Sequence, residues 1–407
     1  MRFLFLTTIY PAHGDSYMTG ELAHELLARG HSVDVLHLAW RAEAGASTQV
    51  RDDRGVTVID VAPRAVQHLG TLAYRASKFL LTSPHAAREL ARHFDLSTYD
   101  ALVAWTPALT VAGPLRRAIA AGLSTRILFV FDFFPIHHRE IGMVPPGPVF
   151  AVAKRMEEAL MRCFTTIVCN LPGNVAYLGR NYRLSAGQHV VSTPLWSEVD
   201  MPALEPRPAV RARLGLPAER PLAIFGGQMV EGRGIEQMLE AAHEAEGAGS
   251  ALAFLFVGNG RLAAPVEAAA ATRDNVFYLA AVPREAYLSL VGACDIGLVA
   301  TVPGVSSFSF PTKTIDYLRA GLPVVAAVEP GSDYLDILRR YDVGEGIEFG
   351  DAEGFLRAAE RQAARKGPDF TARAQRCLDE VFHVRHAADT VLAAVQRVRA
   401  EEGIEAR

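Results

Sequence analysis

Three short segments in the second half of the sequence have the residue types of a phosphate-binding site. In the first, GGQMVEGRG, Gly226 and Gly227 follow an apolar run and Arg233 precedes an amphipathic one. Glycine lets a ligand approach the backbone, and the first amides of a helix together with an arginine favour an anion. The spacing therefore predicts a phosphate contact at Arg233. A glycine turn with a solvated arginine is the alternative.

The second segment, FVGNGRL, places Gly258, Asn259 and Gly260 directly after an apolar run. This tight turn also brings the backbone close to a ligand. The dinucleotide pattern GxGxxG is not completed, because residue 263 is alanine. On these residues alone, a plain turn is the simpler interpretation.

The third segment is FSFPTKTIDYLRAGLPVVA, in which a short predicted helix begins near Pro311 and a buried strand follows. Thr312 and Lys313 would offer amides and a cation to a diphosphate. Asp316, about one turn further along, can accept two hydrogen bonds from a ribose diol. Alternatively, Thr312 caps the helix, Lys313 is solvated and Asp316 complements the helix dipole. Two phosphate-type turns in one domain favour the ligand.

The first half carries polar residues after two apolar runs. The segment RILFVFDFFPIHH ends a very apolar run with Asp132, followed by His137 and His138. A doubly wound sheet presents functional groups at the carboxyl ends of its strands, so Asp132 is a candidate. Each histidine taken alone is also compatible with a surface or packing role. The loop after the first apolar run adds three candidates for a cleft: His13, Gly14 and Asp15.

The elements that must position these residues alternate along the chain. Short apolar runs and amphipathic stretches follow one another, which predicts parallel sheets with crossover helices and two Rossmann-like domains. The proline-rich stretch LWSEVDMPALEPRPAVRARLGLPAERP contains the predicted junction. We expect one Rossmann-like domain over residues 1–198, a second over 199–370 and C-terminal helices over 371–407 that cross back to the first domain.

Composition narrows the function. The 407 residues carry a formal charge of -4, and neither half is basic enough to predict nucleic-acid binding. The four scattered cysteines predict reduced thiols in a cytoplasmic protein, and no apolar run predicts a signal peptide or a membrane span. No HxxxH, HExxH or Asp-x-Asp motif occurs, so we expect no metal and no cofactor. The helical stretches LAYRASKFLL and FAVAKRMEEALMRCF fit either peripheral contact with an anionic membrane or internal packing.

Taken together, these segments resemble glycosyltransferase family 4, whose members are retaining enzymes with the GT-B fold of two Rossmann-like domains facing a central cleft. GGQMVEGRGIEQMLEAA is similar to the family's donor loop, VGNGRL to its second glycine turn, and DYLRAGLPVVA to the end of its Glu-x7-Glu region. TTIYPAHGD, DFFPIHHREIGMV, NLPGNVAYLGRNY and STPLW resemble bacterial polysaccharide-type members. The resemblance covers essentially the whole chain. It implies that the domain over residues 1–198 binds the acceptor and that the domain over 199–370 binds the nucleotide-sugar donor.

The resemblance implies roles for particular residues. Gly227 and Arg233 would contact the donor diphosphate, and Asp316 would take the place of the second glutamate, which holds the ribose hydroxyls. Asp132 would lie near the reacting centre. Gln228 stands where the family usually has arginine, and Phe308 stands where the first glutamate would be, which puts the sugar preference in doubt.

The sequence thus predicts a metal-independent retaining transfer of a sugar from a nucleotide-diphosphate sugar to an acceptor hydroxyl. The acceptor would be a saccharide, a lipid-linked saccharide or a small molecule. Two alternatives remain: a non-hydrolysing nucleotide-sugar epimerase with the same fold, and a catalytically silent subunit. A nicotinamide dehydrogenase is disfavoured, since no complete GxGxxG follows the first strand of either domain.

Overall fold

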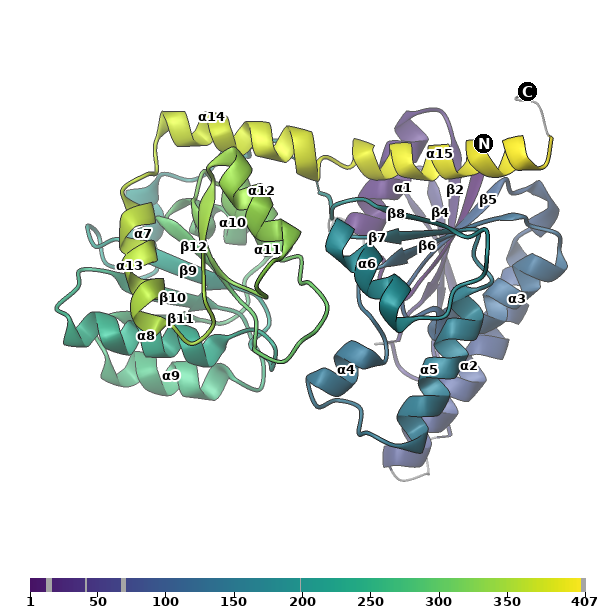
Figure 1. The fold of residues 1–407 in the computed structure, drawn as a ribbon, viewed down its shortest axis with the longest axis horizontal. Coiled ribbons are helices and arrows are strands. Elements are labelled where there is room, and N and C mark those ends of the chain that lie inside the picture. Colours follow the sequence, from purple (N-terminus) through teal and green to yellow (C-terminus); the bar gives the residue numbers. More distant parts are fainter. Residues whose placement is uncertain (12–16, 41, 67–70, 198, 404–407) are drawn as a thin grey trace. The chain divides into compact units, whose positions relative to one another are not determined.

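The computed structural model divides into two compact units (Figure 1). It describes residues 1–11, 17–40, 42–66, 71–197 and 199–403. The N-terminal unit comprises residues 1–197 together with 384–407, and the C-terminal unit comprises residues 198–383. The break between them falls within the proline-rich stretch. The last helix belongs to the unit that begins the chain.

The N-terminal unit is built on an eight-stranded sheet with the order β3-β4-β2-β1-β5-β6-β7-β8. All neighbouring strands are parallel except β3, which runs antiparallel to β4. The strands are β1 (Arg2–Thr7), β2 (Ser32–Leu38), β3 (Gln49–Asp53), β4 (Val56–Val61), β5 (Ala101–Trp105), β6 (Thr125–Val130), β7 (Thr166–Cys169) and β8 (His189–Ser192).

Helices cover this sheet, and α15 from the end of the chain packs against α1 and β6. Strands β5 and β7 are buried along their whole length, as expected of a parallel sheet covered on both faces. The helices are α1 (Met18–Ala28), α2 (Thr71–His93), η1 (Leu96–Thr98), η2 (Ala108–Val111), α3 (Ala112–Ala120), α4 (Ile136–Glu140), α5 (Pro148–Met161), α6 (Pro172–Asn181) and α15 (Arg385–Glu401).

The C-terminal unit is a six-stranded, fully parallel sheet with the order β11-β10-β9-β12-β13-β14. Its strands are β9 (Leu222–Gly226), β10 (Ala253–Val257), β11 (Val276–Leu279), β12 (Ile296–Ala300), β13 (Val324–Ala327) and β14 (Gly344–Ile347). Its helices are α7 (Arg207–Arg213), α8 (Ile235–Gly247), α9 (Ala263–Thr272), α10 (Arg284–Gly292), α11 (Lys313–Arg319), α12 (Asp333–Tyr341), α13 (Ala352–Ala363), α14 (Pro368–Cys377) and η3 (Leu378–Phe382).

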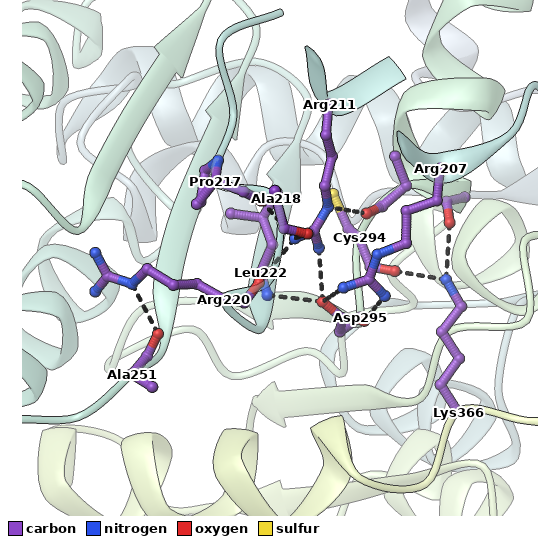
Figure 2. Close-up of polar contacts among 12 residues, drawn as sticks. Arg207, Arg211, Pro217, Ala218, Arg220, Leu222, Ala251, Cys294, Asp295 and Lys366 are labelled. Atoms are coloured by element: carbon purple, nitrogen blue, oxygen red, sulfur yellow. Dashed lines mark hydrogen bonds and ion pairs between the residues drawn. The ribbon is translucent and has the colours of Figure 1, made fainter. Parts of the chain in front are cut away.

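A buried ion-pair network joins the amino ends of β9 and β12 (Figure 2). Asp295 accepts hydrogen bonds from Arg211 Nη2 at 2.8 Å and from the backbone N–H of Leu222 at 2.9 Å, and it also pairs with Arg207. Arg211 is only 1% exposed and donates to the carbonyls of Ala293 at 2.9 Å and Pro217 at 2.7 Å. Because each buried charge is satisfied, the network fixes α7 at this edge of the sheet.

Secondary structure agrees with the predicted alternation in both units. The strands expected from the apolar runs all form, and β3, β8 and β14 are additions. The amphipathic run that follows Arg233 forms α8. The predicted C-terminal helical stretch is divided into α14, the π-helical turn η3 and α15. All four cysteines are free thiols.

Candidate functional site

The order of the C-terminal sheet places the predicted phosphate turns at a switch point. Strand β10 lies on one side of β9 and β12 on the other, so the loops after β9 and β12 leave the sheet side by side. Open α/β sheets bind ligands outside the carboxyl ends of their strands at such a point. The loop after β9 carries Gly227 to Gly234, and the loop after β12 leads to Pro311 and Thr312.

The two glycine turns lie against each other. Gly227 and Gly258 have φ angles of +141° and +145°, which favour glycine. A Cβ atom on Gly258 would lie 1.9 Å from the carbonyl oxygen of Gly227. The backbone N–H of Met229 donates to the carbonyl of Asn259 at 2.9 Å. The structure therefore brings two of the predicted segments into one close-packed backbone surface.

Lys313, the first residue of α11, lies beside this surface. Its Nζ atom is 3.8 Å from the centre of the Phe225 ring, and a Cβ atom on Gly227 would be 4.0 Å from it. Burial lowers the pKa of the Lys313 ammonium well below its ordinary value, and the positive charge of Arg233 lowers it further. Among the described residues, no acid forms an ion pair with either side chain. Two cations thus share a site without a neutralising partner.

The start of α8 positions Arg233. The helix begins after Gly234, whose φ of +59° is left-handed. A Cβ atom on Gly234 would lie 2.4 Å from Cβ of Ala300, the last residue of β12. Only glycine allows this close approach, which draws the loop after β9 onto β12.

The carboxylate of Asp316 already has a partner within the protein. Arg284, the first residue of α10, holds both of its carboxylate oxygens, with Nη1 2.6 Å from Oδ2. The predicted diol-binding carboxylate is therefore already paired by an arginine. Next to it, the hydroxyl of Tyr317 accepts the backbone N–H of Gly226 at 3.2 Å and donates to the carbonyl of Leu298 at 3.2 Å, which ties α11 to β9 and β12.

A buried glutamate holds the loop that leads into α11. Glu329 follows β13, is 4% exposed, and accepts the backbone N–H of Ser309 at 3.0 Å and its hydroxyl at 2.9 Å. Thr312 is exposed at the start of α11 and its side chain makes no capping hydrogen bond. Pro311 is buried and Gln228 is exposed. Glu329 thus fixes the path of the loop, and the Thr312 hydroxyl remains at the surface.

In the N-terminal unit, Asp132 lies just beyond β6 and its atom Oδ1 is buried with no hydrogen-bond partner among the described residues. Burial raises the pKa of this carboxyl, and the charges of His138 and His137 in α4 oppose the shift. Both histidines are half-buried. His13, Gly14 and Asp15 lie outside the described residues.

Known proteins share this sequence pattern and fold. The model of the family Glycosyl transferases group 1 matches residues 220–364, which run from β9 through α13. WcaI of Escherichia coli (strain K12), provisionally assigned as a colanic acid biosynthesis glycosyl transferase, is 24% identical over 338 residues, covering 76% of this chain and 79% of WcaI. The chain is a glycosyltransferase that resembles family 4.

Solved structures establish the fold of this glycosyltransferase over its whole length. Sucrose-phosphate synthase from Thermosynechococcus elongatus superposes with a TM-score of 0.69 at 16% identity, covering 98% of this chain and 100% of that one. Anabaena HepE in complex with UDP-glucose superposes with a TM-score of 0.68 at 14% identity, over 98% of this chain and 100% of HepE. Both units are parallel α/β domains, and the fold is GT-B.

Three charged residues that hold loops or site residues of this glycosyltransferase in place were not predicted from the sequence. In the sequence, Arg284 looks like an ordinary surface arginine near the start of a helix. Only the fold brings it to Asp316. Glu329 lies two residues after the end of the buried strand β13, and that position was a usable signal. Glu157 lies in a helix that also contains basic and apolar residues, so the sequence does not indicate that its side chain is buried. In the structure Glu157 is only 1% exposed.

Two further observations concern metal ions and membranes. No group of three or more His, Cys, Asp or Glu residues within the described ranges is arranged to hold a metal ion. In the same ranges, no helix combines the length and apolar character needed to cross a bilayer.

Proposed function

We propose that this glycosyltransferase moves a sugar, with retention of anomeric configuration, from a nucleotide-diphosphate sugar to an acceptor hydroxyl. The observation that carries the proposal is the presence of two cations, Lys313 and Arg233, beside the glycine turns. Neither cation has an acidic partner among the described residues. Like charges repel, and burial penalises the ammonium further. A diphosphate would neutralise both cations and accept hydrogen bonds from the surrounding amides.

The same charges would assist the chemistry. The bond between the sugar's anomeric carbon and the diphosphate oxygen breaks, and the electron pair leaves with the diphosphate. Lys313, Arg233 and the helix N-terminal amides stabilise that developing charge. The acceptor oxygen forms the new glycosidic bond on the same face of the sugar, and its proton passes to the leaving phosphate oxygen. Asp132 orients the acceptor hydroxyl, and no metal is required.

The ribose of the nucleotide would bind at Asp316. The two ribose hydroxyls would replace the two N–H donors of Arg284, which hold the carboxylate in the unliganded protein. HepE, which shares the fold, binds UDP and UDP-glucose. WcaI is assigned to colanic acid biosynthesis. These likenesses support a nucleotide sugar as donor and a saccharide, free or lipid-linked, as acceptor.

One helix surface supports peripheral contact with an anionic membrane. We name as the α5 surface the residues Val149, Val152, Arg155, Met156 and Arg162, all exposed along one side of α5 and its C-cap. The three apolar side chains are 68%, 54% and 44% exposed. The acids of this helix, Glu157 and Glu158, are buried. A face with apolar and cationic side chains and no acid suits the headgroup region of an anionic bilayer. The free thiols agree with a site at the inner, reducing side.

Thermal unfolding with UDP, GDP, ADP and dTDP tests the donor site without knowledge of the sugar. A ligand that binds only the folded state raises the melting temperature, by an amount equivalent to about 2.7 kcal/mol when present at 100 times its dissociation constant. We expect one nucleotide to stabilise the wild type selectively, and Arg233→Ala and Asp316→Ala to lose that stabilisation.

Arg357→Ala is the matched control for this experiment. Arg357 is also in the C-terminal unit, but it is exposed on α13 and pairs with Glu353 four residues earlier. Its loss should leave the nucleotide effect unchanged. The proposal fails if no nucleotide stabilises the wild type, or if Arg233→Ala responds as the wild type does.

A further inference from the structure

Glu157 clamps the segment that follows β5. It comes from α5, is 1% exposed, and its two carboxylate oxygens accept the backbone N–H groups of Ala108 at 2.6 Å and Leu109 at 2.9 Å. These two residues begin the short helix η2. A buried carboxylate with two amide donors is held in one orientation, so Glu157 fixes the start of η2 against α5.

The same region holds Asp132. Strands β5 and β6 are neighbours, and the hydroxyl of Thr106, just after β5, accepts the backbone N–H groups of Phe131 at 3.1 Å and Asp132 at 3.3 Å. The loops that carry the two carboxyls are therefore tied together. The charges of the two carboxyls act on each other: an ionised Asp132 raises the pKa of Glu157, an effect smaller than that of burial.

Two buried carboxyls on loops that are tied together in this way cannot both be ionised cheaply. Burial raises the pKa of Glu157 to about 7, although its two amide donors oppose the shift. The carboxyl of Asp132 has an amide contact from Phe134 but leaves Oδ1 without a partner among the described residues. The amide donors thus favour the negative charge on Glu157, and a proton shared by the two acids resides on Asp132.

The surrounding charges are few and can be named. His137 and His138 of α4 face Asp132 and oppose its neutral form when they are protonated. Tyr182 lies near both acids, and burial together with those charges raises its pKa, so it stays neutral. Lys154 lies over the Tyr182 ring and pairs with Glu158, the neighbouring acid on α5. No other charged group acts on the two carboxyls in the described part of the chain.

We propose that Asp132 and Glu157 form a one-proton carboxyl pair at neutral pH, in which Glu157 is a positioning residue and Asp132 presents a neutral carboxyl to a hydroxyl of the acceptor. This rests on the proposed transfer function and specifies how its acceptor is held. A protonated carboxyl both donates and accepts a hydrogen bond, as a sugar hydroxyl does. It orients the hydroxyl without taking its proton, which leaves on the phosphate.

Carbon NMR of the side-chain carboxyls tests the pair directly and needs no sugar. With aspartate labelled at its side-chain carbon, the Asp132 signal is assigned by its loss in Asp132→Asn and followed with pH. We expect it to titrate above the ordinary aspartate range in the wild type and to move to lower pH in Glu157→Gln. Glu158→Gln is the matched control, because Glu158 is a buried acid on the same helix that pairs with Lys154. It should leave the Asp132 titration in place.

A purely structural Glu157 would give a different result. Glu157→Gln would then lower the melting temperature without moving the Asp132 titration, and that outcome overturns the pair. If Glu157→Gln does not fold, the reciprocal measurement applies: Glu157 labelled at its carboxyl carbon should titrate lower in Asp132→Asn than in the wild type. An unchanged Glu157 titration overturns the pair in the same way.

The role of the neutral carboxyl is tested in a strain that lacks the gene. Asp132→Asn keeps a neutral side chain that donates and accepts, so it should restore most of the missing saccharide, whereas Asp132→Ala should restore little. Equal loss in both variants overturns the neutral role. A deletion that removes no saccharide instead contradicts the proposed transfer function, and the NMR result on the pair stands apart from that outcome.

Discussion

Arg284 and Asp316 form a two-point ion pair at the carboxyl edge of the C-terminal sheet, with Nη1 2.6 Å from Oδ2 and Nη2 2.5 Å from Oδ1. The side chains are 37% and 15% exposed. An arginine and a ribose diol both offer two donors to a carboxylate, so they compete for the same oxygens. In the proposed nucleotide complex, binding is therefore an exchange in which the arginine leaves Asp316.

Replacing Arg284 by Ala removes the competitor. Because partly exposed ion pairs contribute only about 0.2–1 kcal/mol, we expect nucleotide affinity to rise by roughly two- to fivefold. Asp316→Ala should lower it by about tenfold or more, because the diol loses two hydrogen bonds to a charged acceptor. Calorimetric titration with the nucleotide selected by thermal unfolding measures both. Weaker binding in Arg284→Ala would show that the arginine contacts the nucleotide.

Lys313→Met separates stability from binding. The methionine keeps the length of the side chain and removes a charge that burial and Arg233 both disfavour. We expect the unliganded variant to be at least as stable as the wild type and to lose nucleotide stabilisation. Since the folded-state pKa of Lys313 is depressed, the unfolded wild type binds more protons, and stability rises with pH between the folded value and the ordinary lysine value.

Urea unfolding at several pH values checks this prediction. The wild type should gain stability from Lys313 as the pH rises through that window, and Lys313→Met should lack that part of the increase. A variant that is clearly less stable than the wild type at every pH contradicts the view that the cation is strained without its anion.

Gly258→Ala should disrupt the close-packed backbone surface that the two glycine turns form. The new Cβ atom would lie 1.9 Å from the carbonyl oxygen of Gly227, and the φ of +145° is strained for alanine. We expect a loss of about 2 kcal/mol or more in the free energy of unfolding. Gly247→Ala at the end of α8 is the control: its Cβ meets nothing within 4 Å. It should be between unchanged and about 1 kcal/mol more stable.

The sequence predicts most of the fold because its signals are local. The runs that form β1, β5, β9 and β12 are almost entirely apolar, and each contains β-branched or aromatic residues. A parallel sheet covered on both faces needs such runs. Strand β14, with the sequence GEGI, carries two glycines and one apolar residue. Its pairing with β13 depends on tertiary context, so no local pattern indicates it.

The candidate site divides in the same way. Gly227, Gly258 and Lys313 could be predicted, because glycines after strands and a cation at a helix start have a physical meaning in the sequence itself. The partners Arg284 and Glu157 could not. They lie 32 residues from Asp316 and 49 residues from Ala108. A contact at such separation is set by strand order and helix packing, and a single sequence does not contain either explicitly.

Arg211 should be essential for stability although it is far from the donor turns. Arg211→Met leaves the buried Asp295 without its most buried partner, and breaking such a pair costs about 3–5 kcal/mol. Arg213→Ala on the same helix is the matched control: Arg213 is exposed and pairs with exposed Glu205, a contact worth about 1 kcal/mol or less. Urea unfolding of both variants measures the difference. Similar values would contradict the structural role of the network in Figure 2.

The α5 surface makes a prediction about membranes. Val152→Glu and Met156→Glu replace apolar side chains that are 54% and 44% exposed. Burying such a side chain in the headgroup region contributes up to about 1.5–3 kcal/mol, so each change should weaken binding to phosphatidylglycerol vesicles by about tenfold or more. Neutralising Arg155 or Arg162 removes about 1 kcal/mol of attraction and should weaken binding about fivefold. Vesicle sedimentation measures the bound fraction.

Val50→Glu distinguishes this surface from exposed apolar residues in general. Val50 is 57% exposed on the edge strand β3, next but one to Asp52, and its basic neighbour Arg51 is paired with Asp60. It therefore has the exposure of the α5 residues without their excess of basic charge. This variant should sediment as the wild type does. Binding should also fall when phosphatidylcholine replaces the anionic lipid, because the arginines lose their partners. If the α5 variants bind as the wild type does, the apolar and basic pattern of α5 has no part in membrane contact.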